Sequence, residues 1–402
     1  MSSSELDRAV PDNGALMQTF MDEIFQPLHR VEQRRWARAY LWGLINISGK
    51  RTPRRMALAR ALPSTAAHGL RQFINTSPWD WEPVRHRLSR QIAARTRPRA
   101  WTVAELIIPK RGEYSVGVHQ RMDTVTGLTV NCQRAMGLFL DTDTYCFPVD
   151  WSLVFGGIWD SDSERRRRAR IPENETGHPA GAYVSGFAAD VCARLPLLRA
   201  PWALDLTRCD DADAALAGLA EQGVDVVCEV RASRSVLPAE NTADVTTVGE
   251  LMESRHNRQA HVLIRRNPSG HARSVPVHAH VGKVRLPRLG SGDEGGSRTY
   301  RVLRRPDPDG LRPPRYWITT LTDRRVDEVL RLTRSRAAAL STITTMRQKF
   351  GLLDFEGRSY PGWHHHMTMA SAAYVYQHLY AAPGAVPAAP AASPGELAGT
   401  AS

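Results

Sequence analysis

The stretch AWTVAELII, Ala100 to Ile108, marks the point at which the pattern of the chain changes. Before it, from Ala15 to about Ala94, apolar residues recur at steps of three and four, as they do on one face of a helix. From Ala100 onward, short runs rich in β-branched and aromatic residues predict strands. The sequence therefore predicts a helical unit followed by a sheet whose first strand is this stretch.

The remaining pattern predicts a mixed sheet flanked by helices. Antiparallel strands come first and are followed by alternating strands and helices, which favours an α/β (mixed α+β) fold. The expected strands are 100–108, 114–120, 128–132, 136–140, 202–206, 225–230 and 317–321, with further short strands at 261–266, 274–285 and 300–304. The expected helices after the first strand are 183–195, 211–222 and one long helix at 327–350.

Composition divides the chain into segments. Residues 1–15 are polar and are expected to form a flexible N-terminus, and residues 16–96 form the helical domain, a candidate for DNA recognition. Residues 97–381 form the sheet domain, with an arginine-rich, β-rich insertion at about 231–315. Residues 382–402 are dominated by Ala, Pro, Gly and Ser, a composition typical of a disordered tail.

The net charge favours a polyanionic partner. Lys and Arg number 53 against 41 Asp and Glu, which gives a formal charge of +12, and most of the basic residues are arginine. Arginine binds phosphate with two parallel hydrogen bonds and stacks on bases. A GC-rich genome would also enrich arginine, together with Ala, Gly and Pro, but it would not explain the sign of the net charge.

Cysteine usage and hydropathy favour a cytoplasmic protein. The five cysteines are scattered and never form a CxxC pair, which argues against a disulfide framework or a zinc site. The polar start of the sequence does not resemble a signal peptide. No apolar run reaches the ~18 residues that a membrane-spanning helix needs.

Motifs spread over most of the chain carry a resemblance to a known family. They are Phe20 to Leu44, Gly69 to Asn75 with Trp79 and Trp81, Ser115 to Gln133, Trp159 to Pro172, and Gly351 to Thr368. With them, residues 20 to 380 resemble bacterial insertion-sequence transposases of the DDE superfamily, in the YREK-motif group. The resemblance implies a ribonuclease-H-like sheet, double-stranded DNA as partner and Mg²⁺ as the cofactor of the family.

The resemblance also implies a degraded active site. The three acidic positions of the family fall on Ala104, Asp205 and Leu340, so that only Asp205 keeps its carboxylate. The YREK motif itself reads Thr333, Arg336, Leu340 and Arg347. Two metal ions need a ring of oxygen ligands, which alanine and leucine do not supply. We therefore expect no bound cofactor and no strand cleavage.

Three alternatives concern the acids. Glu105 could replace the acid at Ala104, but neighbouring residues of a strand point to opposite faces, so its side chain should leave on the wrong side. Asp354 and Glu356 lie beyond the long helix and would need a different geometry. Asp205 could also be a turn residue before the acidic segment that follows it, because aspartate is common in turns and helix caps.

Several basic and aromatic residues are candidates for DNA contact. Arg336 and Arg347 lie eleven residues apart, about three helical turns, and therefore share one face. Further candidates are the basic run Arg165, Arg166, Arg167 and Arg168 and the tryptophans Trp79 and Trp81. The alternatives are a solvated surface for the arginines and a place in the core for the tryptophans. Three consecutive histidines, His364 to His366, would fan out on a helix and could not hold one ion together.

Three functions fit these observations. The first is a transposase-derived DNA-binding protein that does not cut DNA, the second is an active transposase with a rearranged set of acids, and the third is a scaffold reused outside nucleic acids. The charge of +12 counts against the third. A homodimer is compatible with each of the three.

Overall fold

The computed structural model describes residues 13–63, 65–122, 127, 129–239, 245–254, 258–266, 272–287, 298–307 and 310–381. Most of the segment expected to be a flexible N-terminus and the whole expected C-terminal tail therefore lie outside the described residues. The helical unit is confirmed, although it begins slightly earlier than expected, at Asn13. Its helices are α1 (Asn13–Ile24), α2 (Val31–Asn46), α3 (Pro53–Ala59), α4 (Ala66–Asn75) and α5 (Glu82–Arg95).

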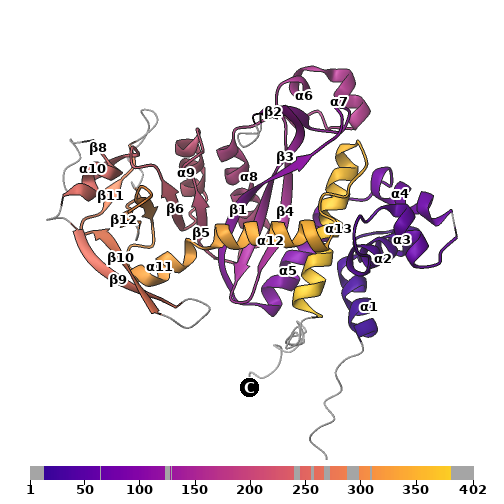
Figure 1. The fold of residues 1–402 in the computed structure, drawn as a ribbon, viewed down its shortest axis with the longest axis horizontal. Coiled ribbons are helices and arrows are strands. Elements are labelled where there is room, and N and C mark those ends of the chain that lie inside the picture. Colours follow the sequence, from indigo (N-terminus) through magenta and orange to yellow (C-terminus); the bar gives the residue numbers. More distant parts are fainter. Residues whose placement is uncertain are drawn as a thin grey trace, which may run out of the picture.

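One large mixed sheet runs through the molecule (Figure 1). Its strand order is β2-β3-β1-β5-β6-β13-β12-β10-β9, and β4 pairs with β3 beside β2. The pairs β1–β5 and β5–β6 are parallel, and the other pairs are antiparallel. The expected ribonuclease-H-like mixed sheet is therefore confirmed. The first strands are β1 (Pro98–Pro109), β2 (Val118–Met122), β3 (Thr129–Thr142), β4 (Cys146–Val154), β5 (Trp202–Asp205) and β6 (Val226–Val230).

The expected insertion extends this sheet at one end. Its strands in the large sheet are β9 (Arg258–Arg266), β10 (Ala272–His280), β12 (Arg301–Arg305) and β13 (Arg315–Thr319). A smaller sheet of β11 (Val284–Arg285), β7 (Ser235–Pro238) and β8 (Thr246–Thr247) lies beside them with α10 (Val248–Glu253).

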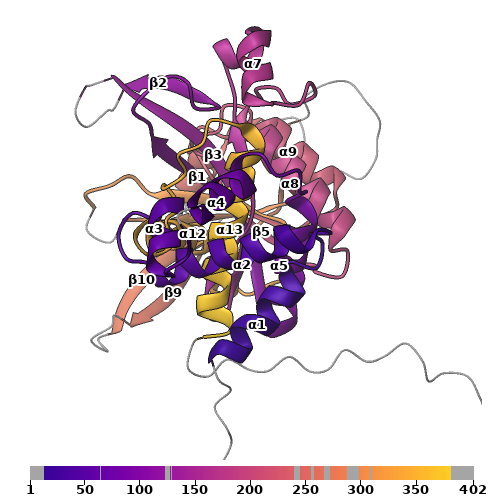
Figure 2. The same cartoon turned by 90° about the vertical axis from the view of Figure 1, so that its right-hand side faces the viewer.

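Helices cover both faces of the sheet. Figures 1 and 2 show α8 (Ala180–Arg194) and α9 (Ala212–Glu221) on one face, opposite α12 (Ser335–Lys349) on the other. The remaining helices are α6 (Ile158–Ser161), α7 (Ser163–Ala169), α11 (Val326–Leu332) and α13 (Tyr360–Leu379). None of the helices in the described part of the chain is long and apolar enough to cross a membrane.

Several details differ from the expected elements. The strand expected at 274–285 is divided between β10 and β11, which lie in different sheets. The strands expected at 128–132 and 136–140 are one strand, β3, because residues 132–141 pair with β1 across the expected gap. Strand β4 was not expected. The helix expected at 327–350 is broken into α11 and α12 at Thr333, whose hydroxyl donates to the carbonyl oxygen of Leu330 and closes the end of α11.

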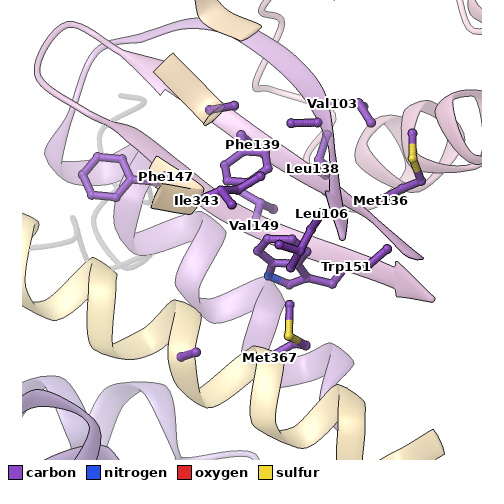
Figure 3. Close-up of a cluster of buried hydrophobic side chains, with 14 of the residues drawn as sticks. Val103, Leu106, Met136, Leu138, Phe139, Phe147, Val149, Trp151, Ile343 and Met367 are labelled. Carbon is purple, nitrogen blue, oxygen red and sulfur yellow. The ribbon is translucent and has the colours of Figure 1, made fainter. Parts of the chain in front are cut away.

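Strand alternation places the core on both sides of the sheet. Figure 3 shows Phe139 and Trp151 of the strands beside Ile343 of α12 and Met367 of α13. These four side chains are at most 5% exposed. Helices α12 and α13 are therefore held to the sheet mainly by apolar contact, which contributes about 25 cal/mol for each Å² of apolar surface buried.

Helix α13 lies between the helical unit and the sheet. Nearly all of its residues are buried, including the three consecutive histidines. His366 accepts a hydrogen bond at Nδ1 from the Tyr40 hydroxyl (2.9 Å) and lies with Nε2 3.0 Å from the carbonyl oxygen of Gly351. A carbonyl oxygen can only accept, so Nε2 carries the proton and the ring is neutral.

Arg85 of α5 connects the same three parts of the molecule. Its guanidinium is buried, forms an ion pair with Asp150 of β4, and donates to the carbonyl oxygen of Trp151 (3.0 Å). It also donates to the Thr368 hydroxyl (2.8 Å) and to the carbonyl oxygen of His364 (3.2 Å), both in α13. One buried cation therefore joins α5, β4 and α13.

We expect replacement of Arg85 by Met to destabilise the fold by about 3–5 kcal/mol, because Asp150 would lose its buried counter-ion. The free energy of unfolding in urea measures this loss. The control is Arg38→Met, since Arg38 pairs with Asp22 on the surface and such pairs contribute at most about 1 kcal/mol. Equal losses in the two variants would contradict a structural role for Arg85.

Stability should fall as the pH drops from 6.5 toward 4. Burial lowers the pKa of His366 from 6.5 to about 4, so in this window the unfolded chain binds a proton that the folded chain does not. Such a group reduces stability by up to about 1.4 kcal/mol per pH unit as the pH falls. Urea unfolding at several pH values should show a shallower dependence for His366→Gln than for the surface variant His29→Gln; identical dependence in both would refute the assignment.

Candidate functional site

The pairing of three parallel strands brings together the elements that carry the first two acidic positions of the expected site. Trp101 of β1 pairs with Trp202 of β5, and both side chains are fully buried. Three residues farther along the chain, β1 carries Ala104 and β5 ends at Asp205. Asp205 in turn pairs with Glu229 of β6. Asp205 and Glu229 therefore form a row at the ends of β5 and β6, and β1, which carries Ala104, adjoins β5.

Helix α12 is fixed over this row by two hydrogen bonds from its buried face. The hydroxyl of Ser335 donates to Asp141 Oδ2 of β3 (2.7 Å). The hydroxyl of Thr342 donates to the carbonyl oxygen of Cys146 in β4 (2.7 Å). These contacts set the position of Arg336, the next residue after Ser335. They also orient the helix face that carries Arg336, Leu340 and Arg347.

Both carboxylate oxygens of Asp205 have partners. Oδ1 accepts hydrogen bonds from the backbone N–H (3.0 Å) and the hydroxyl (2.6 Å) of Thr207. Oδ2 lies 2.8 Å from Nη1 of Arg336. The Thr207 contacts fit a turn residue, and the Arg336 contact points across to α12. Asp205 therefore has the contacts of a turn residue, one of the two alternatives from the sequence, and in addition an ion pair that joins β5 to α12.

Leu340 and Arg347 lie on the same helix as Arg336, as the sequence predicts. Leu340 is one turn beyond Arg336 and is 39% exposed. Arg347 is also exposed, in the last turn of α12. The structure thus brings Asp205 into contact with Arg336, and Leu340 lies one turn farther along α12.

The residues at this place do not fit a pair of divalent metal ions. Ala104 is buried and, like Leu340, offers no oxygen. The oxygens of Asp205 are already bound to Thr207 and Arg336. Within the described residues, no group of three His, Cys, Asp or Glu is arranged to hold a metal ion. The donor set is therefore too poor for the two-metal arrangement.

Glu229 is the site residue that the sequence did not reveal. It is 9% exposed, and its carboxylate forms a two-point ion pair with Arg315 of β13, with Oε1 2.5 Å from Nε. These hydrogen bonds raise the pKa of Arg315, and the negative charges of Glu229 and Asp205 add to the effect. Strand pairing places Glu229 beside Asp205, and local residue patterns do not show which strands pair.

The other acids considered from the sequence lie elsewhere. Glu105 leaves β1 on the face opposite Ala104 and pairs with Arg134 (2.7 Å). Asp354 accepts from the backbone N–H of Arg51 (2.8 Å), and Glu356 pairs with Lys50 (2.6 Å). None of the three contacts Asp205.

The basic run in α7 is largely used within the fold. Arg166 donates to three backbone carbonyl oxygens, those of Trp159, Pro172 and Glu175, at 2.6–2.9 Å. The side chains of Arg167 and Arg168 are 78% and 74% exposed and contact Glu164. Arg165 donates to the carbonyl oxygen of Glu113 (3.3 Å) and lies over the ring of Trp159. Arg167 and Arg168 are thus the members of the run whose side chains extend farthest into solvent.

The two tryptophans take different places. Trp79 is 6% exposed, stacks on Phe73 and His365, and donates to the carbonyl oxygen of Phe73. Its side chain belongs to the core and does not reach a surface. Trp81 is partly buried and stacks on His364 with 4.5 Å between ring centroids.

The comparison with known proteins assigns the chain to a family. No curated protein matches the chain. A family model described as DDE superfamily endonuclease matches residues 23–265, more than half of the 402 residues. The match spans the helical unit and the strands that carry Ala104, Asp205 and Glu229. The chain therefore belongs to the DDE superfamily endonucleases.

Proposed function

We propose that this chain is a transposase-derived protein that binds double-stranded DNA without cleaving it. The observation that carries the proposal is the pairing of Asp205 with Arg336. In this arrangement a guanidinium provides the positive charge beside the remaining acid. Arg336 neutralises the charge of Asp205 without a metal ion, so carboxylates at positions 104 and 340 are not needed for this purpose.

Membership of an endonuclease family supports nucleic acid as the partner. The formal charge of +12 supports the same partner, because phosphate contacts give affinity without any chemistry. Arg336 and Arg347 at the two ends of α12 are the DNA-contacting residues we propose first, since both are exposed on the helix that covers the site. Arg167 and Arg168 of α7 are a second group.

An active transposase with a rearranged set of acids would need three carboxylates near one point. The contacts of the other acids favour the inactive form. Glu105 and Glu356 form ion pairs with Arg134 and Lys50, and Asp354 accepts a hydrogen bond from the backbone of Arg51. Strand pairing sets Glu229 beside Asp205, and the carboxylate of Glu229 forms an ion pair with Arg315. A role outside nucleic acids has no comparable observation in its favour.

We expect the purified protein to bind duplex DNA at low salt and to release it as salt increases, with the linear dependence of log K on log salt that counter-ion release produces. Supercoiled plasmid with Mg²⁺ or Mn²⁺ should remain uncut. Asp205→Asn, purified in parallel, identifies contaminating nuclease, because contamination would cut equally in both preparations. Metal-dependent nicking by the wild-type protein alone would establish the active alternative.

Restoring the acids tests whether Ala104 and Leu340 are the lost corners. We expect Ala104→Asp combined with Leu340→Glu to be stabilised by Mn²⁺, because three carboxylates would then meet at one site. Binding to the folded state alone raises stability by about 2.7 kcal/mol at one hundred times the Kd, which a thermal melt detects. Ala104→Asn with Leu340→Gln is the uncharged control. If Mn²⁺ moves the melting temperature of neither variant, the assignment of these corners is wrong.

A further inference from the structure

Four charged side chains form a continuous row at the carboxyl ends of β5 and β6. Arg336 pairs with Asp205, and Arg315 pairs with Glu229, while strand pairing sets the two acids side by side. The acids are recessed, with side chains 16% and 11% exposed. The arginines are outside them, with side chains 44% and 48% exposed. Solvent therefore reaches the guanidinium groups more easily than the carboxylates.

The formal charge of the row is zero, although it lies in a chain of charge +12. A carboxylate and a phosphate bind the same edge of a guanidinium with the same two-point geometry. The acids therefore occupy the hydrogen-bond donors that a DNA phosphate would use. An incoming phosphate must displace a carboxylate before it can bind Arg336 or Arg315 in this way.

We propose that Asp205 and Glu229 act as internal phosphate mimics, which hold Arg336 and Arg315 in the free protein and give them up to backbone phosphates of DNA. This inference rests on the proposed function, because it presupposes DNA binding. It goes further, because it gives the two acids a role that weakens DNA binding. The acids of a metal site would instead strengthen DNA binding through their ions.

The arginines have supports that do not depend on the acids. Arg336 is carried by α12, whose first turn is tied to Asp141 through Ser335. The guanidinium of Arg315 lies 5.1 Å from the ring centroid of the buried Trp317. When a phosphate displaces the carboxylates, the backbone of Arg336 and the guanidinium of Arg315 thus keep their places at the sheet edge. Displacement of the carboxylates thus makes the positive charge of the two arginines available to a phosphate that approaches from solvent.

The test measures duplex DNA binding by Asp205→Asn and Glu229→Gln, which remove one charge each and preserve shape. We expect each variant to bind about three- to tenfold more tightly than wild type at roughly 0.1 M salt, with a salt dependence steeper by about one phosphate contact. Arg336→Gln and Arg315→Gln should weaken binding. Thermal melts establish that each variant is folded, and either acid alone suffices for the test.

The matched control is Glu105→Gln, which makes the same change in net charge on the opposite face of β1. Its effect on binding should stay below about twofold, since a distant exposed charge is screened by salt. In an Arg336→Gln background, Asp205→Asn should change the affinity for DNA by no more than Glu105→Gln does, because the arginine that it would release is absent.

Three outcomes would overturn the inference. If Asp205→Asn and Glu229→Gln bind DNA no more tightly than Glu105→Gln, the acids do not compete with phosphate, and the proposed function remains intact. Binding that tightens with Mn²⁺ in the wild type, but not in Asp205→Asn, would make the acids metal ligands. Failure of wild type and all variants to bind DNA at low salt would overturn the proposed function together with this inference.

Discussion

The register of β1, β5 and β6 is the constraint on which the site depends. It is set where Trp101 meets Trp202, two fully buried side chains on adjacent parallel strands. A shift of one residue would move these tryptophans to the opposite face of the sheet, where they would not fit the packing around them, so the register is strongly defined. Everything at the carboxyl ends follows from it, including the neighbourhood of Ala104, Asp205 and Glu229.

The arrangement of charge gives a physical account of how a metal site can decay without loss of the fold. A lone aspartate in a recessed position is costly unless a cation or a set of donors satisfies it. Arg336 and Thr207 satisfy Asp205, and Arg315 satisfies Glu229. In the proposed function, fixed guanidinium groups replace exchangeable ions, and the sheet edge keeps its acids without the ring of ligands.

Local patterns in the sequence predicted the elements but not their neighbours. Helical periodicity predicted the helices before β1, and strand patterns predicted β1, β5 and β6, because these signals lie within a few residues of one another. The partners of the acids could not be predicted in this way. Arg315 is 86 residues from Glu229 along the chain, and only the order of strands brings them together. Trp79, which the sequence suggested for DNA contact, lies in the core because His365 and Phe73 cover its ring.

The burial of α13 has a consequence for the synthesis of the protein. This helix is the last described element of the chain, yet its residues pack between the N-terminal helices and β4. During translation, those earlier elements leave the ribosome while the segment that covers them is still missing. Arg85 then has neither Thr368 nor the carbonyl group of His364 to bind. A nascent chain must therefore keep apolar surface exposed until nearly its full described length has emerged.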